Sequence, residues 1–374
     1  MEDVFITKFF INKVRHLKYI GIKLSQTEKK HLILTGKNGS GKTSLLEEIK
    51  SYIKEYEITM NEDNNEKYVT LKVKAEQKTN PSLFIFYNYE ENDIKNILSV
   101  YIGAKRSLYM EQPMSIEKII FNKAIDNDLS KDFLKYMIYL DYQILSIEEK
   151  DNEHHLIKWF NNFTKALREV YNCPELEMKR ISKDLTFKVY MPNYEPFGLN
   201  EMSDGYAAFL DVIQELILRM DNGDGIVNYN MPGIVLIDEI EAHLHIELQK
   251  KILPFLTTMF PNIQFIVSTH SPFVINSISN AVVFDLEKQR RVEDLSAYSY
   301  ETIIESYFDI NQYSHLMENK FNRYKELYHK ERSHEEEKEF FKIRAELGTV
   351  SPAQKELYNA FQQMELKLRG KAGS

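Results

Sequence analysis

Residues 36–43 read Gly36-Lys37-Asn38-Gly39-Ser40-Gly41-Lys42-Thr43 and fit the pattern G-x-x-x-x-G-K-[ST]. An apolar, strand-like stretch at 31–35 precedes them, and apolar residues at helical spacing follow from Leu45 to Ile53. The glycines allow the backbone to curl so that successive N–H groups face phosphate oxygens, and the N-terminus of the following helix favours the same anion. The segment therefore predicts a nucleotide-phosphate loop joining a strand to a helix in an α/β fold.

The chemistry expected of this loop is that of ATP bound together with Mg²⁺. Lys42 would reach the β- and γ-phosphates, and the Thr43 hydroxyl would ligate Mg²⁺. The expected nucleotide-binding residues of the loop are Gly36, Asn38, Gly39, Ser40, Gly41, Lys42, Thr43 and Ser44.

Two further apolar runs end in polar side chains. The run Ile234-Val235-Leu236-Ile237 is followed by Asp238 and Glu239, and a second run at 263–267 is followed by Ser268-Thr269-His270-Ser271-Pro272. Both runs are typical of buried parallel strands. We expect Asp238 to hold Mg²⁺ through water, Glu239 to act as the general base, and His270 to contact the γ-phosphate. Glu239, His270 and Lys42 are thus the predicted catalytic residues.

Composition and charge limit the class of protein. The chain has 374 residues, 48 Lys and Arg against 56 Asp and Glu, and a formal net charge of −8, so no global basic field would attract nucleic acid. Cys173 is the single cysteine, which fits a reducing cytoplasm. The sequence does not open with a signal-peptide pattern, and no apolar run reaches the ~18 residues needed to cross a bilayer. We expect a cytoplasmic protein with no membrane contact.

The residues at 199–206, Leu199-Asn200-Glu201-Met202-Ser203-Asp204-Gly205-Tyr206, resemble the signature motif of the ABC-class ATPases. The Ser-Asp-Gly form is similar to that of the RecF/SMC-like branch and of the ATPases of OLD and Septu-type phage-defence systems. Residues 238–245 resemble the acid pair and D-loop of that class, and residues 264–272 resemble its switch-histidine strand. The motifs occur in the expected order and cover roughly residues 1–285.

The resemblance implies an ABC-type ATPase head of the α/β class. Its mixed or parallel sheet would carry an N-terminal antiparallel β lobe, a helical insertion and a helical C-terminal tail. The expected divisions are an N-terminal ATPase lobe at 1–114, the insertion at 115–181, a C-terminal ATPase lobe at 182–299 and the tail at 300–374, a candidate partner-binding element. A helical pattern extends from Ser115 to Ile181, and Ser333 with Glu336 forms a capping-box pattern in the tail, as does Ser351 with Gln354.

The resemblance also implies that the site needs two molecules. Ser203, Asp204 and Gly205 would cap the γ-phosphate held by a partner's phosphate loop, so that a homodimer, or a higher even oligomer, encloses two ATP molecules. The class carries a glutamine-bearing loop between its first two motifs. Arg106 and Gln112 are both candidates for that position.

Three functions are compatible with these motifs. In the first, ATP-driven dimer closure controls a separate effector protein, a nuclease or toxin, in prokaryotic antiviral defence. The second is a RecF-like repair ATPase that binds DNA across its dimer, for which the basic stretch from Lys13 to Lys23 is the candidate surface. The third is a transporter motor, against which the Ser-Asp-Gly and Thr-His-Ser-Pro forms argue.

Overall fold

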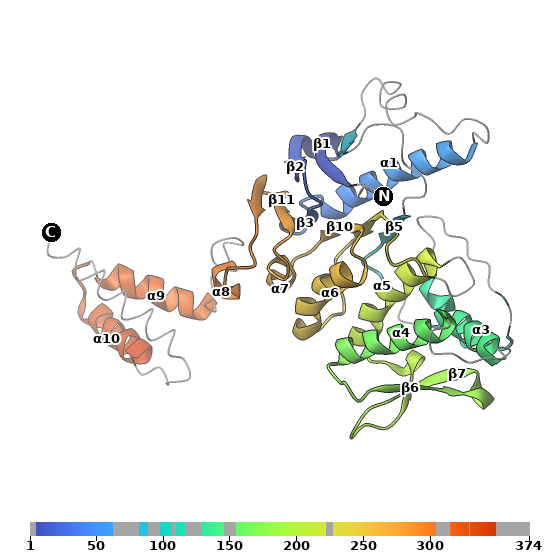
Figure 1. Ribbon diagram of the computed structural model, residues 1–374. Helices are drawn as coiled ribbons and strands as arrows, with labels where there is room; N and C mark the ends of the chain where they lie inside the picture. Colours follow the sequence, from blue (N-terminus) through green and yellow to red (C-terminus); the bar gives the residue numbers. More distant parts are fainter. Residues whose placement is uncertain are drawn as a thin grey trace. The chain divides into compact units, whose positions relative to one another are not determined.

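The computed structural model describes residues 5–62, 82–88, 98–106, 110–116, 118, 129–145, 155–221, 227–303, 315–328 and 330–348. The chain forms two compact units, Met1–Tyr300 and Glu301–Ser374, and each is described here by itself (Figure 1). The second capping box expected in the tail, at Ser351 and Gln354, lies outside the described residues.

A six-stranded central sheet organises the first unit. Its strands are β3 (His31–Thr35), β5 (Leu98–Ile102), β9 (Gly233–Ile237), β10 (Ile263–Ser268), β11 (Ala281–Asp285) and β12 (Arg290–Glu293), and their order is β12-β11-β3-β10-β9-β5. All neighbours pair in parallel except β11 and β12. Every residue of β3, β9, β10 and β11 is buried, as expected of parallel strands covered on both faces.

A three-stranded antiparallel sheet covers one face of the central sheet. It comprises β1 (Ile6–Val14), β2 (Leu17–Lys23) and β4 (Leu83–Tyr87), in the order β2-β1-β4. Helix α1 (Lys42–Glu62) packs between the two sheets through Leu45, Leu46 and Ile49, which are fully buried with apolar residues from both sheets.

Gln264 of β10 joins the two sheets with its side-chain amide. Its Oε1 accepts from the N–H of Ile6 at 2.7 Å, and its Nε2 donates to the carbonyl of Ile6 at 3.0 Å and that of Lys30 at 2.8 Å. The side chain is fully buried, so these bonds satisfy an amide that would otherwise destabilise the core. They fix the start of β1 against β10.

Helices lie on the other face of the central sheet (Figure 1). They are α3 (Phe133–Leu145), α4 (His155–Tyr171), α5 (Asp204–Met220), α6 (Ile246–Met259) and the short α7 (Pro272–Ile275), with 3₁₀ turns at Ser130–Asp132, Ser182–Asp184 and Leu199–Glu201. Helix α5 is buried almost throughout, including its polar residues Asp211, Glu215 and Arg219. It is therefore an internal helix that holds charged groups inside the protein.

The helical pattern expected up to Ile181 is wrong at its end. Helix α4 stops at Tyr171, and β6 (Glu177–Ile181) pairs antiparallel with β7 (Thr186–Tyr190), which pairs with β8 (Phe197–Gly198). The residues of β6 include Glu, Met, Lys and Arg, which favour helices when isolated. Pairing with the partly buried β7 overrides that propensity.

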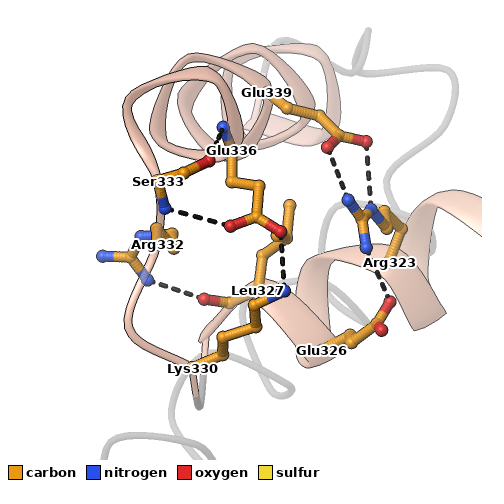
Figure 2. Close-up of polar contacts among 8 residues, drawn as sticks. All are labelled: Arg323, Glu326, Leu327, Lys330, Arg332, Ser333, Glu336 and Glu339. Atoms are coloured by element: carbon orange, nitrogen blue, oxygen red, sulfur yellow. Dashed lines mark hydrogen bonds and ion pairs between the residues drawn. The ribbon is translucent and has the colours of Figure 1, made fainter.

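The second unit contains a pair of helices, α9 (His315–Tyr328) and α10 (His334–Gly348); the short α8 (Tyr300–Thr302) precedes them. Buried Tyr324 and Leu327 of α9 pack with Phe340, Ile343 and Leu347 of α10, and the rings of Tyr324 and Phe340 stack with centroids 4.9 Å apart. Polar contacts surround this small core (Figure 2). The helical character expected of the tail is therefore present in its described residues.

The capping box predicted at Ser333 is confirmed. The N–H of Ser333 donates to the Glu336 carboxylate at 3.0 Å, and the N–H of Glu336 donates to the Ser333 hydroxyl at 3.3 Å (Figure 2). These reciprocal bonds satisfy two N–H groups at the start of α10.

The predicted fold class is confirmed: a mixed sheet, mostly parallel, with an antiparallel N-terminal sheet and helices inserted between β5 and β9. Within the described residues, no helix combines the length and apolar character needed to cross a bilayer. The parallel order has one direct consequence for the site. The carboxyl ends of β3, β5, β9 and β10 meet at one edge of the central sheet, where ligands of open α/β sheets bind.

Candidate nucleotide site

The loop between β3 and α1 has the backbone conformation that its glycines predict. Gly36, Gly39 and Gly41 have φ angles of 129°, 83° and 98°, in the region that other residues rarely adopt. A Cβ at Gly36 would lie 2.9 Å from the Ser40 hydroxyl, so the loop closes tightly there. The ring of His16, from the β1–β2 turn, meets the carbonyl of Ser40 at 3.2 Å. The loop is therefore a closed curl supported by the antiparallel sheet.

Lys42 lies inside this curl. Its Nζ donates to the carbonyl of Gly36 at 3.0 Å and to that of Lys37 at 3.3 Å, and the residue is 6% exposed. Burial lowers the pKa of Lys42, while the nearby carboxylates of Glu239 and Asp238 act in the opposite direction. The loop thus holds a cation on its inner side, where the sequence places the phosphates.

Asp238 and Glu239 follow β9 as predicted, and Ser268 at the end of β10 fixes both. The Ser268 hydroxyl donates to the Asp238 carboxylate at 2.5 Å and accepts from the N–H of Glu239 at 2.7 Å. Glu239 has φ of 45°, a left-handed conformation unusual for a residue with a side chain. The backbone at the acid pair is therefore bent and held by its neighbour strand.

His270 lies one strand further along the same edge. Its backbone N–H donates to the Glu241 carboxylate at 2.5 Å. Burial lowers the pKa of the His270 ring, the charge of Lys42 lowers it further, and Glu241, Glu239 and Asp238 act in the opposite direction. The ring is consequently neutral at pH 7 and can accept as well as donate a hydrogen bond. The structure thus brings Lys42, the acid pair and His270 together.

Arg106 also reaches this edge, whereas Gln112 does not. Arg106 follows β5, and its Nη2 lies 3.4 Å from the carbonyl of Asp238 and 3.3 Å from that of Glu239. Gln112 is part of another region, where its Nε2 donates to the carbonyl of Asp184 at 2.7 Å. Of the two candidates, the structure therefore places Arg106 beside the acid pair.

Two residues of the site carried no predicted role. Ser268 and Glu241 stood inside quoted motifs, but only the structure shows that they fix the acid pair and the backbone at His270. Ser268 ends β10 and Glu241 lies four residues after the end of β9, and this closeness to the ends of two parallel strands was the available signal.

Ser203 is the N-cap of α5, and Asp204 and Gly205 form its first turn. Ser203 and Asp204 are exposed, and Ser203 makes no side-chain capping bond. A Cβ at Gly205 would lie 3.1 Å from the His245 ring and 3.2 Å from the His243 carbonyl, so the segment contacts the loop after the acid pair. The structure thus leaves the hydroxyl of Ser203 and the N-terminus of α5 accessible to another molecule.

The residues at the sheet edge fit ATP and Mg²⁺. The Oγ of Ser40, the Oγ1 of Thr35, the Oε2 of Glu241 and the Nη1 of Arg106 are buried and have no hydrogen-bond partner within the described part of the chain. Such atoms after β3, β5 and β9, at the same edge of the central sheet, favour a site completed by a polar ligand. Thr43 is exposed at the start of α1 and Asp238 ends β9, which suits a hard cation that keeps water and phosphate oxygens as ligands.

Comparison with known families gives the class of protein. Residues 81–276 match the family described as "AAA domain, putative AbiEii toxin, Type IV TA system". The match covers more than half of the chain, and the chain belongs to this family. The predicted resemblance to ABC-like ATPases of defence systems is confirmed.

The curated relatives include two Septu proteins PtuA and a retron ATPase. The chain is 28% identical over 310 residues to a Septu protein PtuA of Bacillus mycoides, covering 77% of this chain and 41% of the relative. It is 25% identical over 250 residues to the Retron Ec83 probable ATPase of Escherichia coli, covering 63% and 44%. It therefore spans less than half the length of these two relatives. A Septu protein PtuA of Bacillus thuringiensis is 27% identical over 303 residues, covering 71% and 73%.

Among solved structures, the SMC head domain from Thermotoga maritima aligns with 75% of this chain and 94% of its own, at 12% identity and a TM-score of 0.38.

Proposed function

We propose that the protein binds and hydrolyses ATP with Mg²⁺ at the edge of the central sheet. The observation that carries this proposal is the meeting of four groups that follow three separate strands: Lys42 after β3, Asp238 and Glu239 after β9, and His270 after β10. Mg²⁺ at this site would supply neutralisation of the negative charge that develops on the phosphates. Thr43 and Asp238 would hold it, while the loop residues 36–44 would bind the phosphates.

In this proposal Glu239 accepts the proton of the attacking water. Its position next to Ser268 fixes the main chain, and His270, neutral at pH 7, is available to orient the water or contact the terminal phosphate. Lys42 is the counter-charge for the phosphates and would exchange its two loop carbonyls for phosphate oxygens.

We further propose that two copies enclose the nucleotide and that closure controls a separate effector protein, a nuclease or toxin, in antiviral defence within the cytoplasm. The exposed Ser203 at the N-terminus of α5 supports the first part, because its hydroxyl and the backbone N–H groups there suit an anion held by a second protomer. The similarity to a PtuA and a retron ATPase supports the second part.

Two variants test the enzymatic proposal. Lys42→Ala should lose ATP binding, because the loop loses its buried cation. Glu239→Gln should bind ATP with unchanged affinity and hydrolyse it roughly 10²–10⁴-fold more slowly, because the water loses its base. Calorimetry and phosphate release measure the two effects, and sedimentation with ATP measures dimer formation. Hydrolysis by Glu239→Gln at the wild-type rate would refute the role of Glu239.

The same variants test the effector. We would tag Glu239→Gln, express it in the native host and compare the proteins that co-purify with those bound by Lys42→Ala. A stoichiometric nuclease- or toxin-like protein, retained only by Glu239→Gln, is the expected result. A chain that gives full protection against phage without any such partner would contradict the proposal.

DNA is a second candidate partner, supported by the charge of the β1–β2 hairpin. Residues 5–24 contain Lys8, Lys13, Arg15, Lys18 and Lys23 but no Asp or Glu, in a chain with net charge −8. The corresponding test is binding to duplex DNA with ATP present as a function of salt, since phosphate contacts weaken steeply as salt rises. Recovery of DNA and recombination proteins with Glu239→Gln would favour this function over effector control.

A further inference from the structure

Arg106 is a buried cation with incomplete hydrogen bonding. It is 8% exposed, its Nη2 approaches the carbonyls of Asp238 and Glu239, and its Nη1 has no acceptor among the described residues. Burying a guanidinium with an unsatisfied donor is unfavourable, so packing alone does not explain why an arginine occupies this position. Its contacts instead indicate that Arg106 acts on the acid pair, Asp238 and Glu239.

The loop that carries Glu239 is held from two sides. On the β10 side, Ser268 accepts from the N–H of Glu239, and its carbonyl accepts from the N–H of Ile240 at 3.1 Å. On the β5 side, Arg106 holds the carbonyls of Asp238 and Glu239. Because Glu239 has φ of 45°, its conformation depends on these contacts. Arg106 supplies the contacts on the β5 side.

We propose that Arg106 is a positioning residue for the general base: from the β5 side it holds the main chain of Asp238 and Glu239 in place. This inference rests on the proposed ATP hydrolysis and adds a residue that sets the hydrolysis rate through the main chain of Glu239. Arg106 itself need not touch the nucleotide. A misplacement of about 1 Å at a reacting group lowers a rate by roughly 10²-fold.

The test compares Arg106→Met with a matched arginine outside the site. Arg291 donates to two consecutive carbonyls in the same way, to Lys23 at 2.7 Å and Leu24 at 3.1 Å. For Arg106→Met we expect ATP affinity within about threefold of wild type and kcat lowered about 10²-fold. Arg106→Lys, which keeps the charge, should recover part of that loss, and Arg291→Met should leave both constants unchanged.

A second readout does not depend on hydrolysis. Hydrogen exchange of the nucleotide-free protein should rise in the peptide covering 238–242 for Arg106→Met, while exchange in β11 stays at the wild-type level. If wild type fails to hydrolyse ATP, the proposed function falls, and this exchange pattern still decides the role of Arg106. Unchanged exchange at 238–242, or equal loss of ATP affinity and kcat, would overturn the inference.

Discussion

Two arginine–glutamate pairs, one in each unit, have similar N–O distances and different surroundings. Arg219 and Glu215 on α5 meet at 2.6 Å with side chains 1% and 6% exposed. Arg323 of α9 and Glu339 of α10 meet at 2.8 Å with side chains 35% and 41% exposed (Figure 2). Solvent screens the second pair and leaves the first unscreened. The distance between two charged groups therefore does not determine how much their contact contributes to the free energy of unfolding.

The same contrast extends to the neighbours of each pair. Around α5, the N–H of Leu129 bonds Glu215 and the hydroxyl of Ser130 bonds Asp211, both inside the protein. Around α10, Arg323 also bonds Glu326, and Lys330 bonds Glu336, all at the surface (Figure 2). The buried contacts fix α5 against the turn that begins α3, whereas the exposed ones surround a core made by Tyr324 and Phe340. Five predictions test this difference.

The largest effect is expected from Arg219→Met. The substitution removes the cation of a buried pair and leaves the Glu215 carboxylate without it, which costs about 3–5 kcal/mol. Urea unfolding of the full chain, followed through the first unit by hydrogen exchange of α5, measures the loss. A change in the free energy of unfolding below about 1 kcal/mol would show that Arg219 and Glu215 contribute no more than the exposed pair in the second unit.

Ser268→Ala should lower the hydrolysis rate. The hydroxyl serves both Asp238 and Glu239, so its loss removes one bond to each and frees the backbone at the general base. We expect kcat to fall about 10²-fold while ATP still binds. Phosphate release and calorimetry measure the two quantities, and wild-type kcat in this variant would show that the acid pair keeps its position without Ser268.

His31→Asn should reduce the acid sensitivity of the first unit. Burial lowers the pKa of His31 to about 3, and its Nδ1 accepts from the N–H of Phe265 at 3.1 Å. The unfolded chain binds this proton below pH 6.5 and the folded chain does not, so stability falls as pH drops from 6.5 toward 3, by up to about 1.4 kcal/mol per pH unit. Asn keeps an acceptor but cannot titrate.

The measurement for His31 is urea unfolding at pH 7.0 and pH 5.0. Between these values wild type should lose about 2 kcal/mol more than His31→Asn. Equal losses of unfolding free energy in the two proteins would mean that burial does not lower the pKa of His31 in the folded protein.

Ser333→Ala is the exposed counterpart of Ser268→Ala. It also removes a hydroxyl that bonds a neighbouring backbone N–H, here at the start of α10. Loss of a capping residue costs about 1 kcal/mol. Hydrogen exchange at the first turn of α10 should increase by the corresponding factor, with kcat unchanged. An effect on kcat as large as that of Ser268→Ala would remove the distinction between the two serines.

The smallest effect is expected for Arg323 and Glu339. A double-mutant cycle with Arg323→Met and Glu339→Gln should give a coupling of about 0.2–1 kcal/mol that decreases as salt rises. Exchange of α9 and α10 amides provides the measurement. A coupling of several kcal/mol, insensitive to salt, would show that the exposed pair behaves like Arg219 and Glu215.

The sequence predicts those parts of the site whose residues stand close together in the chain and have side chains typical of one chemistry. The glycines at 36–41, the acids that end β9 and the histidine that follows β10 are local signals, and parallel strands bring their ends together. The Ser333 capping box is local too. Arg106 could not be separated from Gln112, because the choice depends on which side chain returns to β9 across 132 residues. The strand β6 was missed because its side chains favour a helix when read without β7.

The strand order has a consequence for synthesis of the protein. β3 lies between β10 and β11, so a strand at residues 31–35 receives its two neighbours only after residues 263–285 have left the ribosome. Until then an apolar edge and the phosphate loop beside it lack their partners, and non-local pairing of this kind is slow. A nascent chain that stops short of β11 is therefore a natural client for chaperones, and a fragment comprising only the predicted N-terminal lobe should not fold by itself.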